Sequence, residues 1–193
     1  MRKPIIAGNW KLNNTLQQAI ELVTLLKRGL SDVTDVDVVV CPVATALTDV
    51  KDVLNESNIG LGAQNVYWED AGAFTGEISA PLLKDIGVQY VIIGHSERRS
   101  YYREGDELLN RKTKLALSKG LKPIFCCGEV LEEREEGKLF DVIREQVSVG
   151  LAGLSKEDMS KVLSLMNLYG PLVQELLLRP IRHRRCTNSS GIS

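Results

Sequence analysis

The chain has 193 residues, of which 44% are apolar and 25% are charged, and its formal net charge is −1. These values are ordinary for a folded protein of one or two domains. The near-neutral charge argues against a nucleic-acid partner, and no apolar run approaches the roughly 20 residues that cross a bilayer. Since the first residues also lack a secretory signal pattern, we expect a cytoplasmic protein.

Short apolar runs alternate with amphipathic segments from the start of the chain to about residue 163. The runs predict strands at 5–8, 36–41, 59–63, 90–93 and 121–126, and a sixth apolar run begins at 159–163. The amphipathic segments predict helices at 15–30, 44–55, 80–86, 107–119 and 140–151. Strands that alternate with helices in this way indicate βαβ units and a parallel sheet.

Six strands fit either a doubly wound open sheet or most of a (β/α)8 barrel, and the pattern alone does not choose between them. The glycine patterns weigh against a dinucleotide fold, because no Gly-x-Gly-x-x-Gly opens a helix and no Gly-Lys-Ser/Thr phosphate loop is present. The first strand instead ends in Gly8-Asn9-Trp10-Lys11. In a barrel, the active site lies at such carboxyl ends of strands.

A second candidate segment is Val91-Ile-Ile-Gly-His-Ser-Glu-Arg-Arg99, which places a wholly apolar run directly before His95. This is the pattern of a buried parallel strand that ends at a functional loop. His95 is one of two histidines, and the other, His183, lies in a tail of different composition.

In a barrel, Asn9, Lys11, His95 and Glu97 converge at one end. A cation, an amide and an imidazole there can polarise a carbonyl group while a base removes an adjacent proton. A purely structural role also stays open for each residue: a solvated lysine, a turn-capping asparagine, a histidine at a strand boundary, or an ion pair of Glu97 with Lys11 or Arg98.

The four cysteines show no zinc spacing and no Cys-x-x-Cys pair, so no metal site is predicted. Cys41 and Cys126 each close an apolar run, which suits a reduced cysteine that acts as a small core residue. A nucleophilic cysteine is the alternative, and it requires a base nearby.

Several segments closely resemble the triosephosphate isomerase family, in matching order and spacing. They are Gly8-Asn-Trp-Lys11, Gly62-Ala-Gln-Asn65, Ala73-Phe-Thr-Gly-Glu-Ile-Ser79, Ile93-Gly-His-Ser-Glu-Arg-Arg99 and Cys127-Gly-Glu129. The resemblance implies an α/β fold, an incomplete TIM (β/α)8 barrel with about six of its eight βα units. It also implies the interconversion of dihydroxyacetone phosphate and glyceraldehyde 3-phosphate through an enediolate, in glycolysis and gluconeogenesis, with neither cofactor nor metal.

Carried over to this chain, the resemblance gives Asn9 and Lys11 as substrate-binding residues and His95 and Lys11 as catalytic residues. Triosephosphate isomerase is itself a well-described pairing of a glutamate base with a neutral histidine electrophile. Supporting positions fall on Glu97, Cys126 and Glu129. The loop around Thr75 is similar to the one that the family inserts into a partner subunit, which implies a homodimer.

The resemblance ends after Leu163, where the family continues with residues close to Ile-Ala-Tyr-Glu-Pro-Val-Trp-Ala-Ile-Gly-Thr-Gly. This chain instead has Ser164-Leu-Met-Asn167, so Asn167 stands at the position of the family's base, and strands seven and eight are absent. A one-base frame shift with permitted codons restores all twelve family-like residues. We therefore predict a partial isomerase domain at 1–163 and an aberrant, frame-shifted tail at 164–193.

Two hypotheses about activity follow from this break. The first is a triosephosphate isomerase, and the second is a catalytically inactive fragment that lacks the base and part of the phosphate site. Another sugar-phosphate barrel enzyme is a weaker third alternative. The arginine-rich tail invites a nucleic-acid or membrane partner, but an unselected peptide explains it better, so neither partner is predicted.

Overall fold

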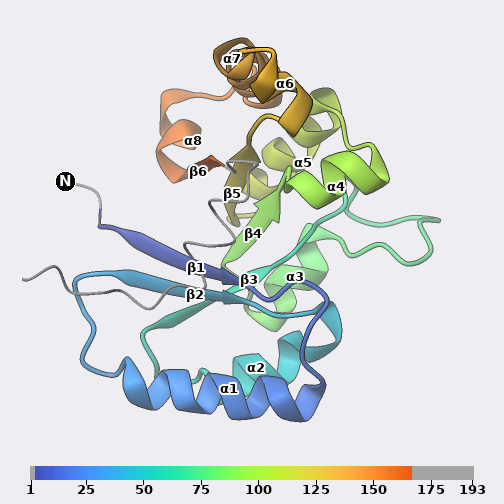
Figure 1. Cartoon of the computed structure of the whole chain (residues 1–193). Helices are drawn as coiled ribbons and strands as arrows, with labels where there is room; N and C mark the ends of the chain where they lie inside the picture. Colours follow the sequence, from blue (N-terminus) through green and yellow to red (C-terminus); the bar gives the residue numbers. More distant parts are fainter. Residues whose placement is uncertain (1–2, 167–193) are drawn as a thin grey trace, which may run out of the picture.

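The computed structural model describes residues 3–166. Its centre is one parallel sheet in which each strand pairs with the next along the chain, in the order β1-β2-β3-β4-β5-β6. The sheet curls into part of a barrel, with the helices on its outer side (Figure 1). The strands are β1 (Ile5–Asn9), β2 (Asp37–Cys41), β3 (Ile59–Ala63), β4 (Tyr90–Ile93), β5 (Lys122–Cys127) and β6 (Leu163–Met166).

Helices connect consecutive strands. They are α1 (Leu16–Gly29), the 3₁₀ turn η1 (Ala44–Ala46) with α2 (Leu47–Val53), α3 (Ala80–Ile86), α4 (Ser96–Tyr102), α5 (Asp106–Ser118), α6 (Leu131–Glu135), α7 (Leu139–Gly150) and α8 (Lys156–Lys161). Thr15 caps α1 as predicted, and its hydroxyl accepts the Gln18 N–H. None of the described helices is long and apolar enough to span a membrane.

Apolar side chains are buried on both faces of the sheet. Val40 belongs to the cluster between the sheet and the helices, whereas its neighbours Val39 and Cys41 belong to a cluster that also holds Ile92 and Cys126. Alternate residues of a strand point to opposite faces, so this strand is buried on both sides. Sequential strand order lacks the reversal that a doubly wound sheet needs, and the prediction of an incomplete TIM barrel is confirmed.

The sixth apolar run differs from its prediction. Residues 159–161 end α8 rather than beginning a strand, because Ser155 starts that helix with a capping box to Asp158. The strand begins only at Leu163, and it pairs with β5 as far as Met166. The predicted boundary at 163 thus falls within β6. The tail from residue 167 onward lies outside the described residues, so the frame-shift hypothesis stays a prediction.

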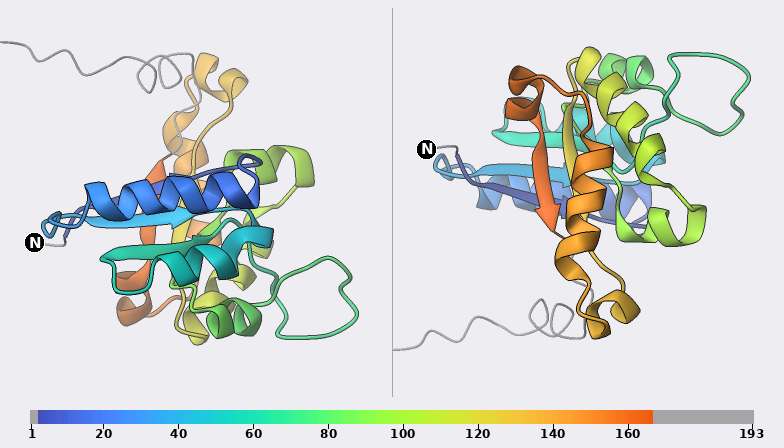
Figure 2. Two further views of the ribbon diagram at one scale, coloured as in Figure 1. Left: turned by 90° about the horizontal axis from the view of Figure 1, so that it is seen from below. Right: turned by 90° about the horizontal axis from the view of Figure 1, so that it is seen from above.

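Three short helices, α4, α6 and α8, were not predicted. The loop between β3 and α3, which the resemblance predicts to insert into a partner subunit, projects far from the body of the molecule (Figure 2). Its residues 71–77 are all exposed. This loop and the carboxyl ends of the strands are the features that position the candidate site.

Candidate functional site

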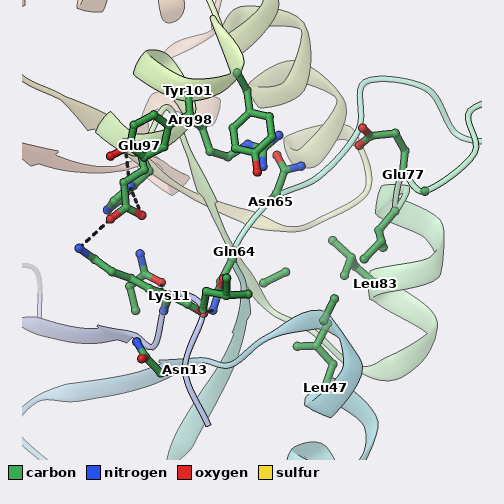
Figure 3. A pocket seen from close by; sticks show the side chains of 18 residues that line it. Lys11, Asn13, Leu47, Gln64, Asn65, Glu77, Leu83, Glu97, Arg98 and Tyr101 are labelled. Atoms are coloured by element: carbon green, nitrogen blue, oxygen red, sulfur yellow. Dashed lines mark hydrogen bonds and ion pairs between the residues drawn. The ribbon is translucent and has the colours of Figure 1, made fainter. Parts of the chain in front are cut away.

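A cavity of about 590 Å³ opens at the carboxyl ends of the first strands. Its size lies in the range of small-molecule sites. Asn9, Lys11, His95 and Glu97 all line it, so the structure brings together the four residues that the sequence placed at strand ends (Figure 3). They meet because parallel strands β1 and β4 both end at this edge of the curled sheet.

Lys11 follows β1 in a constrained conformation. Its φ angle of 53° lies in the left-handed region, which is uncommon for a residue with a side chain. Two hydrogen bonds hold it there. Its N–H donates to Asn9 Oδ1 at 3.0 Å, and its carbonyl oxygen accepts from Gln64 Nε2 at 2.9 Å. The same Gln64 amide also donates to the carbonyl oxygen of Cys41 at the end of β2, so Lys11 is tied to two neighbouring strands.

The Lys11 ammonium group pairs with a carboxylate across the cavity. Lys11 Nζ lies 2.8 Å from Glu97 Oε1, and both side chains are about half exposed. Of the two partners that the sequence left open for Glu97, the structure selects Lys11, because Arg98 donates to Glu104 at 2.8 Å instead. An exposed pair of this kind contributes little to stability, but it fixes where the positive charge sits.

His95 is the N-cap residue of α4, with its side chain only 15% exposed. Its Nδ1 accepts the backbone N–H of Glu97 at 3.3 Å, which assigns the ring proton to Nε2. Burial lowers the pKa of His95 below its ordinary value of 6.5; Glu97 acts in the opposite direction, and Lys11 lowers it further. A Glu97 carboxylate oxygen also lies 3.5 Å from Nδ1, but the hydrogen bond that Nδ1 accepts from the Glu97 backbone N–H and the burial of the ring favour its neutral form.

Sequence reasoning assigned no role to Asn65, which also lines the cavity. Lys112, whose side chain is 2% exposed, donates to Asn65 Oδ1 at 2.8 Å and to Glu104 Oε1 at 2.7 Å. Glu104 also accepts from Arg98, another cavity residue. One buried carboxylate therefore links two walls of the cavity. Gln64 and Asn65 stood in a recognised motif, but their contacts depend on residues distant in sequence.

The remaining predicted positions lie around the cavity rather than in it. Cys126 is buried in the cluster with Cys41, and burial raises the pKa of each thiol to about 12. Buried thiols of raised pKa are poor nucleophiles, so the structure favours the core role for these two cysteines. Glu129 is buried beside a second cavity of about 260 Å³. Thr75 is exposed on the projecting loop, next to the cavity-lining Gly76.

The geometry suits an anionic substrate that carries a carbonyl group. Lys11 supplies a fixed positive charge. A neutral His95 can donate a hydrogen bond from Nε2 to the carbonyl oxygen without adding a second positive charge to the site. Over residues 3–166 the structure contains no group of three or more histidine, cysteine or acidic side chains that could hold a metal ion.

Comparison with known proteins agrees with this geometry. Residues 4–166 match the family described as triosephosphate isomerase. A triosephosphate isomerase of Alkaliphilus metalliredigens is 51% identical over 162 residues, which cover 84% of this chain and 65% of the relative. A triosephosphate isomerase of Carboxydothermus hydrogenoformans is 57% identical over 157 residues, covering 81% and 62% of the two chains. The chain thus spans less than two thirds of the length of these relatives.

Proposed function

The chain belongs to the triosephosphate isomerase family, and on that premise we propose that its cavity binds a triose phosphate and polarises the carbonyl group of that substrate. The reaction of the site is the interconversion of dihydroxyacetone phosphate and glyceraldehyde 3-phosphate, in cytoplasmic glycolysis and gluconeogenesis. The observation that carries this proposal is the hydrogen bond from the Glu97 N–H to His95 Nδ1, which leaves Nε2 as the donor in the cavity that Lys11 also lines.

Each cavity residue has a distinct role in this proposal. Lys11 attracts the phosphate group and stabilises the negative charge that develops on the enediolate. Asn9 donates from its amide, since its Oδ1 is occupied by the Lys11 N–H. His95 donates from Nε2 to the carbonyl oxygen, which lowers the energy of the enediolate formed when the adjacent carbon loses its proton. The ion pair with Glu97 keeps the Lys11 charge in place before substrate arrives.

Proton removal needs a base, and the sequence register puts Asn167 at the position of the family's glutamate. A carboxamide does not accept a proton at neutral pH. We therefore propose that the 193-residue chain binds triose phosphates but turns them over far more slowly than its intact relatives. Loss of a general base commonly costs about 10²–10⁴-fold in rate.

Binding and turnover are measured separately to test this proposal. In isothermal titration of the purified chain with glycerol 3-phosphate, which cannot isomerise, we expect binding that Lys11→Met abolishes. Lys161→Met, which removes a positive charge from an exposed lysine paired with Glu157 on α8, is the matched control and retains binding. An isomerisation assay beside the Alkaliphilus metalliredigens enzyme should give turnover lower by at least about 10²-fold. Turnover comparable to that of the relative would refute the proposal that the chain is nearly inactive. Binding by Lys11→Met as tight as by the parent chain would refute the assigned site.

We also propose that two copies form a homodimer through the projecting loop. On the side away from Lys11, the cavity is lined by Leu47 and Leu83 (Figure 3). This apolar end has the character of a socket for a loop tip, and the chain carries an exposed tip at Phe74 and Thr75. Insertion of that tip into the cavity of a second copy buries apolar surface on both sides.

A further inference from the structure

The projecting loop is internally ordered although it stands away from the body of the protein. Its neck is closed by a hydrogen bond from the Tyr67 N–H to the Ile78 carbonyl oxygen at 2.8 Å. The Tyr67 ring stacks on Trp68 with centroids 3.9 Å apart and contacts Phe74 at 4.6 Å. The tip residue Phe74 therefore folds back onto the neck, so the aromatic rings set the shape of the loop.

Helix α5 contacts the same loop through two cations. Arg111 lies over the Trp68 ring, 5.1 Å from its centroid, and donates to Glu69 Oε1 at 3.2 Å. Lys119, which follows the last residue of α5, forms an ion pair with Asp70. These pairs join segments more than forty residues apart in sequence, and all four charged side chains are at least one third exposed.

We propose that Arg111 and Lys119 form a cationic clasp that holds the loop in its insertion-ready shape and makes self-association of the chain depend on ionic strength. This inference rests on the proposed homodimer. The clasp itself is a property of one copy, so it can be tested whether or not two copies associate.

The physical reason is the entropy that loop ordering costs. A loop that is disordered before insertion must lose that freedom on binding, and this loss weakens association. A loop already held by the clasp has lost most of it. Exposed ion pairs and a cation over an aromatic ring are individually weak and, for the ion pairs, screened by salt, so the clasp shifts the equilibrium between loop shapes without locking one.

Limited proteolysis of the full chain measures how well the clasp holds the loop, because a loop that opens more often is cut faster. Chymotrypsin cleaves after aromatic residues, and Phe74 is the exposed aromatic of the loop. At concentrations where sedimentation shows monomer, we expect the Arg111→Gln/Lys119→Gln variant to be cut in the loop roughly five-fold faster than the parent, or more. Its dimer dissociation constant should be about tenfold higher, and added NaCl should narrow both differences.

The matched control is Arg144→Gln/Lys161→Gln, which removes the same two charges from exposed pairs on α7 and α8. It should match the parent in both measurements. A variant that carries Lys119→Asp and Asp70→Lys together exchanges the charges of the second ion pair. Its loop should be cut as slowly as that of the parent chain. Equal cleavage rates in the double variant and the control would overturn the clasp. A parent chain that stays monomeric at every concentration would instead overturn the homodimer and leave the cleavage test to decide the clasp.

Discussion

At the scale of single residues, the site depends on how His95 and Lys11 are held. His95 follows β4 and caps α4, and the N–H that it accepts comes from Glu97, the residue that also pairs with Lys11. One acidic residue therefore orients the ring with its backbone and positions the cation with its side chain. Because Glu97 favours the charged imidazole and burial opposes it, the protonation state of His95 reports the balance of these contacts.

This balance predicts how His95 titrates. Proton NMR should place the His95 midpoint below the ordinary 6.5, because burial disfavours the charged ring. Glu97→Gln should lower it further, since a negative charge near the ring is lost, and Lys11→Met should raise it. The second histidine signal, from His183, is assigned with His183→Gln. A His95 midpoint at or above 6.5 contradicts the neutral ring.

The lowered pKa of His95 also makes the free energy of unfolding depend on pH. Between the lowered folded pKa and the unfolded value of 6.5, the unfolded chain binds more protons than the folded one. The contribution of His95 to folding is therefore present above about pH 6.5 and is lost as the pH falls below it. Urea unfolding of the parent and of His95→Gln across this range should show a difference that shrinks on acidification.

At the scale of elements, the sequence predicted the longer helices and the buried strands well. Periodicity is clear in a segment such as α1, which has nearly four turns, and β3 and β4 have the predicted bounds. Three helices were missed: α4, α6 and α8. Part of α8 was predicted as an apolar run, whereas α4 and α6 are short segments rich in charge. No residue type in α4 or α6 indicated a helix there.

Two glycines at helix ends show how packing separates sites that look alike in sequence. Gly150 ends α7, and a Cβ atom there would overlap the Phe125 ring, with Cε2 only 2.9 Å away. Gly29 ends α1, where a Cβ atom would meet nothing within 4 Å. Phe125 is fully buried in β5 and cannot move aside easily.

We predict opposite effects for the same substitution at these positions. Gly150→Ala should lower the free energy of unfolding by about 1–3 kcal/mol, because it overpacks the core. Gly29→Ala should raise it by up to about 1 kcal/mol, because alanine has the better helix propensity. Denaturant unfolding measures both. A Gly150→Ala variant as stable as the parent would mean that α7 and β5 separate at little cost.

At the scale of the whole molecule, the sheet has two open edges within residues 3–166. Among the described strands, β1 pairs only with β2, and β6 only with β5. An unpaired edge offers backbone donors and acceptors to another chain. On β1 this edge carries Ile6, which is 64% exposed.

Edge-to-edge association is therefore expected, and a charge on the edge should reduce it. Ile6→Lys should slow the growth of light scattering in a concentrated sample, because the lysine would have to be desolvated when two edges pair. Leu25→Lys is the control, since Leu25 is equally exposed but lies on helix α1. If both variants scatter like the parent, association does not use the β1 edge.

Local patterns in the sequence were enough to predict an α/β fold with a parallel sheet, the strand ends that carry Asn9, Lys11 and His95, and the burial of Cys41 and Cys126. These follow from local patterns, in which an apolar run and the residue after it are read together. Three contacts became known only from the folded structure. Glu97 pairs with Lys11 rather than Arg98, Gln64 donates a hydrogen bond to the Lys11 carbonyl oxygen, and Arg111 of α5 pairs with Glu69 of the projecting loop. Each of these contacts joins residues far apart in the chain, and only the curl of the sheet and the packing of helices on it bring them within reach.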